Sequence, residues 1–126
     1  MTESLLGELQ DTEARQAVID STLALFKRWQ LHEVNQSQLL GVSSISTLKR
    51  QSPDKLEMAV FTRMGNILAI DRALQKHFCY EPKNRDNWIL QSQEELKGET
   101  PLDIMLTQGD KGIRKIKQLA ESLSEY

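Results

Sequence analysis

The side chains best suited to catalysis in this sequence are one cysteine and two histidines. Cys79 follows His77 by two residues at the end of a helical pattern. Because residues two apart on a helix point to different sides, we do not expect the thiol and the imidazole to form a dyad. His32 stands alone, and we expect it at the surface or at a helix cap. One cysteine and two histidines also lack the paired spacing typical of zinc ligands.

The acidic residues do not form a recognisable catalytic pair either. Glu94 and Glu95 are adjacent, and Asp54 precedes Glu57 by three residues, positions typical of surface charges or of a helix start. No glycine-rich loop that could hold a phosphate is present. An enzyme needs a nucleophile, a base or a metal within reach of one another. We therefore expect no catalytic residues, no bound metal and no cofactor, and interpret the chain as a non-enzyme.

Composition bounds the class of protein. The chain has 126 residues, 39% of them hydrophobic and 27% charged, with a net charge of −2. This length suits one compact domain or two very small ones that share a core. The slightly acidic balance argues against a protein that coats nucleic acid through lysine and arginine, although a local DNA-reading face remains open. A lone cysteine, no long apolar run and no signal peptide in MTESLLGELQDTEAR together predict a cytoplasmic protein with no membrane segment.

Apolar residues recur at intervals of three and four along the whole chain, which predicts an all-α fold without sheet. The expected helices are bounded by local signals. We expect a short helix or a frayed lead-in over 3–9, then a helix from a capping Asp11 to about Trp29. Two short helices within 31–51 around Gly41 and a long helix from Ser52-Pro53-Asp54 to about 78 should follow. The rest of the chain is expected to form a short helix capped by Asn84, a helix from Thr100-Pro101, and a last helix after Gly109-Asp110.

The stretch HEVNQSQLLGVSSISTLKR (32–50) has the spacing of a helix-turn-helix unit. Ser37 supplies the small residue where two helices meet, and Gly41 the turn four residues later. Ile45 and Leu48 are the apolar anchors after the turn, one residue later than is commonest. Hydroxyls and cations at the start of the second helix could meet phosphates and base edges, with Lys27 and Arg28 joining from the preceding helix. The candidate DNA-binding residues are Ser43, Ser44, Ser46, Thr47, Lys49 and Arg50.

The alternative interpretation is a helical hairpin kept for packing. Lys49 and Arg50 would then be solvated surface charges.

The downstream half carries a resemblance to a known family. The segments RMGNILAIDRALQKHF, NWI, LKGETPLDIML and QGDKG occur in that order. Together they resemble the antitoxin Xre/MbcA/ParS family over roughly residues 35 to 123. The matching positions are Arg63, Ile67, Leu68, Ala73, Leu74, Phe78, Trp88, Leu96, Gly98, Pro101, Leu102 and Gly112. The chain departs from the family pattern at QSQEE (91–95), where a Pro-Asn pair is usual, and in serines where the recognition helix often has arginines.

The resemblance implies an antitoxin of a type II toxin-antitoxin system. Its partner would be a RES-type toxin that degrades NAD, and the antitoxin would cover the active site of that toxin. It would also repress its own operon by binding DNA. Residues 1–52 would form a helix-turn-helix-like region packed against a toxin-binding domain of residues 53–126. A homodimer is expected because helix-turn-helix proteins usually pair their half-sites. The alternative function is a stand-alone helix-turn-helix transcription regulator without a toxin.

The candidate toxin-binding residues lie mostly on the last helix. Arg114 and Lys117 belong to a basic face, and Glu121 and Glu125 follow it. A toxin pocket for NAD phosphates is expected to be basic, so the acidic groups are the candidates to approach it; for any single residue the alternative is a solvated surface charge. Trp29 and Trp88 are expected in the core, with partial exposure of Trp88 at the interface as its alternative. The toxin-binding set is Trp88, Arg114, Lys117, Glu121, Glu125 and Tyr126.

Overall fold

The computed structural model describes the backbone of residues 2–124 and the side chains of residues 11–124, and this part of the chain is entirely helical and loop, without strands. The predicted all-α fold is therefore confirmed. Three short 3₁₀ turns, η1, η2 and η3, lie between the helices. The elements are α1 (Thr2–Arg28), α2 (Glu33–Leu40), α3 (Ile45–Arg50), η1 (Pro53–Lys55), α4 (Met58–His77), α5 (Pro82–Asn87), η2 (Trp88–Leu90), η3 (Glu94–Leu96) and α6 (Pro101–Ser122).

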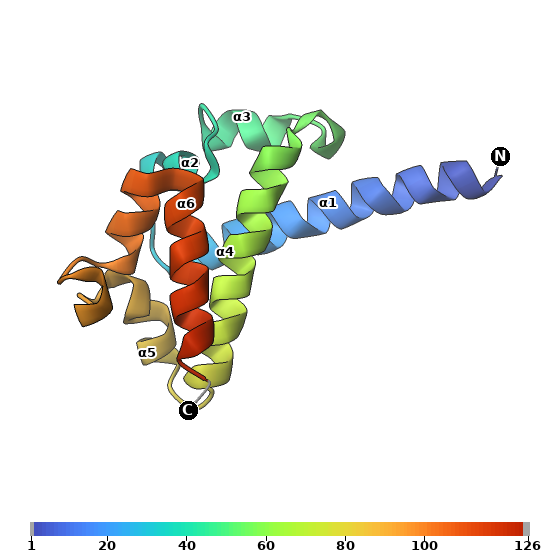
Figure 1. Cartoon of the computed structure of the whole chain (residues 1–126). Helices are drawn as coiled ribbons and strands as arrows, with labels where there is room; N and C mark the ends of the chain where they lie inside the picture. The colour runs from blue at the N-terminus through green and yellow to red at the C-terminus, as the bar shows by residue number, and fades with distance from the viewer. Residues whose placement is uncertain (1, 125–126) are drawn as a thin grey trace.

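Helix α4 is the centre of the fold, with α6 along one side and α1 crossing it on the other (Figure 1). Its inward face carries Met64, Ile67 and Leu74, all fully buried. Apolar residues of α6 at a three-residue interval, Ile113 and Ile116, are also fully buried. The two stripes pack because a helix with one apolar face must bury it against another element.

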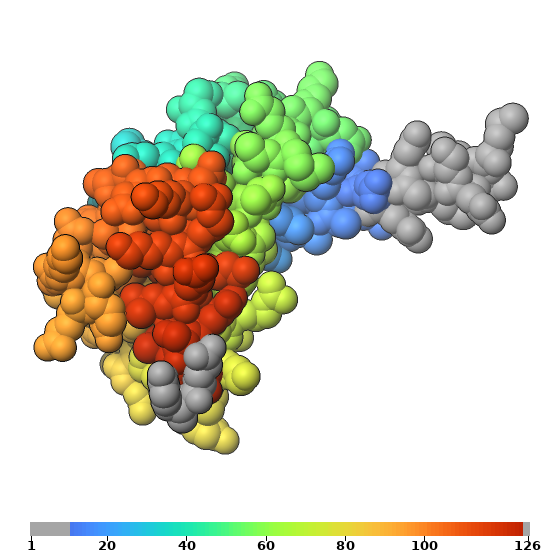
Figure 2. Space-filling model, viewed as in Figure 1, coloured from blue at the N-terminus to red at the C-terminus, as the bar shows by residue number. Residues whose placement is uncertain are grey.

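A single hydrophobic cluster extends across the predicted boundary at residue 52. Phe26 of α1 and Leu40 of α2 belong to it together with Met64 and Ile113. In the space-filling view, the α2–α3 segment and the first part of α6 form one continuous surface (Figure 2). The expected core positions of Trp29 and Trp88 are confirmed, since their exposed fractions are 2% and 4%.

Three helix starts differ from the sequence prediction. Asp11 caps nothing and lies inside α1, because no glycine or proline between residues 8 and 15 interrupts that helix. Ser52 caps the separate turn η1, and α4 begins only at Met58. Asp54, the acid of the predicted start, instead accepts hydrogen bonds from Thr12 and Arg15 and so ties η1 to α1.

The third difference concerns Asn84. It lies within α5 rather than capping it, and Pro82 opens the helix in its first turn. Proline suits that position because its fixed φ is helical and its missing N–H would have no partner there.

The predicted start and break of α6 are confirmed. The Thr100 hydroxyl accepts a hydrogen bond from the Asp103 N–H at 3.1 Å, and Pro101 follows in the first turn. Gly109 has φ 60° and ψ −133°, which kinks α6 at the predicted break. Residues with a side chain rarely adopt this conformation.

No helix in the described part of the chain is both long enough and apolar enough to cross a membrane.

Candidate functional site

The segment predicted as a helix-turn-helix unit forms two short helices, α2 and α3, around Gly41. Gly41 has φ 70° and ψ 31° and ends α2, while its N–H is directed to the last carbonyls of that helix. Ser44 begins α3: its hydroxyl accepts the Thr47 N–H at 3.1 Å. Ile45 and Leu48 then reach the core, 2% exposed each. The one-residue shift of these anchors is therefore accommodated within the α2–α3 packing.

Four of the six candidate DNA-binding residues are exposed. Ser46, Lys49 and Arg50 lie on the outer face of α3, and Ser43 lies in the turn before it. Ser44 and Thr47 are half-buried, and the Ser44 hydroxyl donates to Thr47 Oγ1 at 2.8 Å. Those two hydroxyls are therefore engaged in holding the start of the helix.

Two cations differ from the sequence interpretation of this face. Lys55 of η1 lines the same surface pocket as Ser44, Thr47 and Gln51, so it can join Lys49 and Arg50. Sequence reasoning missed Lys55 because it placed that residue inside the long helix. Arg28 is engaged elsewhere, in ion pairs with two aspartates.

Arg63 of α4 joins the helix-turn-helix unit to the kink of α6. Its Nη1 donates to the Leu39 carbonyl oxygen at 3.1 Å, one of the unpaired carbonyls at the end of α2. Its Nε donates to Asp110 Oδ1 at 2.6 Å, directly after the kink. A Cβ at Gly41 or at Gly109 would lie 3.2 or 3.3 Å from the guanidinium group. Both glycines therefore also make room for this arginine.

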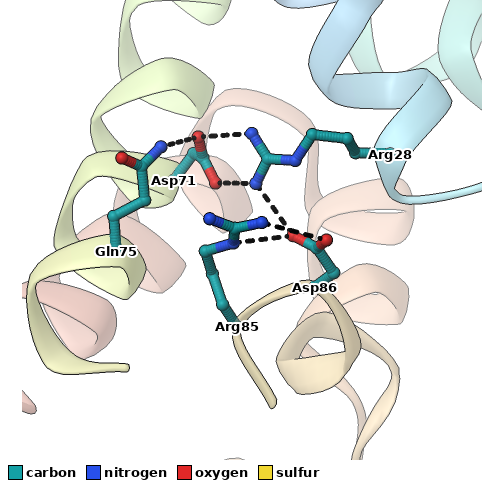
Figure 3. A network of polar contacts seen from close by, with 5 residues as sticks. All are labelled: Arg28, Asp71, Gln75, Arg85 and Asp86. Carbon is teal, nitrogen blue, oxygen red and sulfur yellow. Dashed lines mark hydrogen bonds and ion pairs between the residues drawn. The ribbon is translucent and has the colours of Figure 1, made fainter. Parts of the chain in front are cut away.

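A second polar network joins α1, α4 and α5 (Figure 3). Arg28 donates to both carboxylate oxygens of Asp71, at 3.1 and 2.7 Å, and from Nη2 to Asp86 at 2.8 Å. Gln75 donates to Asp71 at 2.7 Å, and Arg85 Nε to Asp86 at 3.0 Å. Asp71 is only 6% exposed, and these hydrogen bonds offset the cost of burying its carboxylate.

The network shifts the ionisation of two of its members. The hydrogen bond to Asp71 raises the pKa of Arg28 above its ordinary value, against the effect of burial, and Asp86 adds to it. Burial raises the pKa of the Asp86 carboxyl, but hydrogen bonds from Arg85 and Arg28 outweigh this and hold that pKa below its ordinary value. Both groups are therefore charged at neutral pH.

The candidate toxin-binding residues are spread over the surface and the core. Arg114 is exposed on α6, and Lys117 lies 3.7 Å from Glu121 as an ion pair one turn apart. These last two residues line an open pocket between α4 and α6, together with Arg72 and Lys76. Trp88 contributes its side chain to the core. Glu125 and Tyr126 lie outside the described residues.

Cys79 and His77 belong to no metal-binding group among the described residues. Cys79 is exposed, and the His77 ring makes an edge contact with the Phe78 ring at 4.5 Å between centroids. Among the residues that the structure describes, no group of three His, Cys, Asp or Glu side chains could hold a metal ion.

Compared with models of known protein families, with curated proteins and with solved structures, the chain matches none of them.

Proposed function

We propose that this chain is the antitoxin of a type II toxin-antitoxin pair. It binds a RES-type toxin through the α4–α6 half and covers the active site where that toxin degrades NAD. Through α3 it binds DNA of its own operon and represses it. The chain itself carries out no reaction.

The proposal is carried by the structural roles of residues at positions that match the antitoxin family. Arg63 is the residue that joins α2 to the kink of α6. Gly98 has φ 88°, and Pro101 opens α6. A Cβ at Gly112 would overlap the Ile104 carbonyl oxygen, so only glycine fits there. These four matching positions therefore shape this half of the molecule, which supports a shared architecture.

Co-expression with a RES-type toxin tests the proposal. We expect this chain to rescue cells from the toxin, to copurify with it and to preserve cellular NAD. A chain that neither rescues the cells nor copurifies with the toxin contradicts the antitoxin function.

The acidic residues near the end of the chain give a sharper test of toxin binding. We predict that Glu121→Gln combined with Glu125→Gln lowers toxin affinity by roughly tenfold, as expected for losing charge-assisted contacts to a basic pocket. The measurement is calorimetric titration of the purified toxin. Glu33→Gln with Glu57→Gln, two exposed acids at the starts of α2 and α4, is the matched control. Unchanged affinity of the Glu121/Glu125 variant would contradict a role of these two acids in toxin binding.

A stand-alone transcription regulator is the second candidate, favoured by the exposed hydroxyl and basic face of α3. We predict that Lys49→Ala with Arg50→Ala weakens operator binding and reduces the slope of log affinity against log salt by roughly 2, about one unit for each lost phosphate contact. Lys83→Ala with Lys111→Ala removes the same charge from other exposed positions and should leave the slope unchanged. Equal binding by wild type and by the Lys49/Arg50 variant would contradict DNA binding through α3.

A further inference from the structure

The outer face of α4 carries an apolar stripe that α1 covers only in part. Met58, Phe61, Gly65 and Leu68 follow one another at intervals of three and four residues, which places them on one side of the helix. Met58 is 66% exposed, and Phe61 and Leu68 are half-buried. Val18 of α1 borders the same open groove. Along α4 the residues that line this groove extend from Met58 to Arg72.

No contact or backbone conformation in the described part of the chain requires a glycine at position 65. It lies inside α4 with no positive φ, and an added Cβ would meet nothing within 4 Å. Glycine in a helix interior destabilises the helix relative to alanine. A small residue on an exposed helix face allows a second helix to approach closely, because the distance between packed helices depends on the side chains at their contact.

Unpaired charges of opposite sign mark the two ends of this groove. Asp11 lies one turn before Arg15, which contacts Asp54 and the Phe61 ring near the start of α4. Arg72 lies fourteen residues after Met58, about 21 Å further along α4 at 1.5 Å per residue. Asp11 and Arg72 both form no ion pair with any residue among 11–124. A patch with an acid at one end and a base at the other is complementary to a copy of itself turned by 180°.

We propose that this groove binds a second copy of the same chain, with the two α4 helices antiparallel and crossing at Gly65. In a two-fold interface the same patch serves both subunits. Around a crossing at Gly65, Phe61 then packs against the partner's Leu68, and Met58 lies beside the partner's Arg72. Asp11 of each subunit meets the partner's Arg72. This dimer depends on the surfaces of α1 and α4 alone, and needs neither DNA nor toxin.

The experiment measures the mass of the full chain by sedimentation equilibrium without DNA or toxin. We expect twice the chain mass. Arg72→Asp and Asp11→Arg, each alone, place like charges together and should weaken dimerisation by about tenfold or more, a change of about 1.4 kcal/mol per tenfold. The double variant Asp11→Arg with Arg72→Asp restores opposite charges and should recover the dimer.

Gly65→Gln separates folding from assembly. Glutamine is a better helix former than glycine, so the folded monomer should be at least as resistant to thermal unfolding, while the close crossing is lost. Val34→Glu, at an apolar residue of α2 that is 75% exposed and outside the groove, is the control and should leave the dimer intact. A monomeric wild type overturns the proposal, as does a dimer that withstands Gly65→Gln and both single charge changes.

Discussion

Arg63 is a side chain that joins parts of this molecule distant from one another in sequence. One guanidinium group reaches the end of α2, 24 residues before it, and Asp110, 47 residues after it. It is four-fifths buried, so water replaces these bonds poorly when they are lost. The turn of the helix-turn-helix unit and the kink of α6 therefore depend on the same residue.

We predict that Arg63→Ala lowers the free energy of unfolding by about 2 kcal/mol, as expected for lost hydrogen bonds to a charged group. It should also speed amide hydrogen exchange in α2 and α3 before the rest of the molecule. Denaturant unfolding and native-state hydrogen exchange measure the two effects. Arg114→Ala, at an exposed arginine of α6, is the control and should change stability by less than about 0.5 kcal/mol. Equal effects of the two variants would contradict the bridging role.

At the scale of elements, α5 is too short to be stable alone, and the Arg28 network attaches it to α1 and α4. Helices well below 12–15 residues are marginal in water. The six residues of α5 include no buried one, and Asp86 provides its ion pair to α1. The position of α5 therefore depends on ionised carboxylates.

We predict that this attachment weakens in acid. The pKa of Asp86 in the fold is lower than its ordinary value of 3.8, so the stability it contributes is present above 3.8 and is lost as the pH falls through the lower folded value. Asp86→Asn should therefore be less stable than the wild type at neutral pH, and the difference should disappear well below pH 3.8. Unfolding by urea across this range measures it. Asp20→Asn, at an exposed aspartate of α1 hydrogen-bonded to Gln16, is the control and should change stability little. A difference for Asp86→Asn that does not shrink in acid would contradict the argument.

At the scale of the whole molecule, one hydrophobic cluster includes residues from both sides of the predicted boundary at residue 52. Small domains with a single core usually unfold in one cooperative step. We therefore predict that Trp29 of the N-terminal part and Trp88 of the C-terminal part report the same transition.

Single-tryptophan variants test this prediction. In Trp29→Phe and in Trp88→Phe, the midpoint from the remaining tryptophan's fluorescence should coincide with the midpoint from far-ultraviolet circular dichroism of the same variant. Two separated transitions would instead favour residues 1–52 and 53–126 as independent domains.

Most helices could be predicted from the sequence because their signals are local. Gly41, Ser44, Thr100 and Gly109 act within a few residues of themselves through φ, a hydroxyl cap or a kink. The apolar stripes likewise predicted which faces are buried. The same local rules were wrong at Asp11, where the preceding residues continue the helix without a break.

The exposed face of α3 could be predicted from sequence spacing alone, because it follows from the period of one short helix. The other candidate surfaces depend on tertiary contacts.

The partners of Arg28 and of Arg63 lie between 24 and 58 residues away, and nothing in the local pattern selects one aspartate among many. The same holds for the partly exposed stripe of α4, because the residues that α1 and α6 leave exposed follow from how three helices pack. The sequence by itself determined the helices and their buried faces, since backbone propensity and apolar periodicity are local. Only the tertiary structure decided which charges pair and which face of α4 stays open, since these depend on contacts between distant segments.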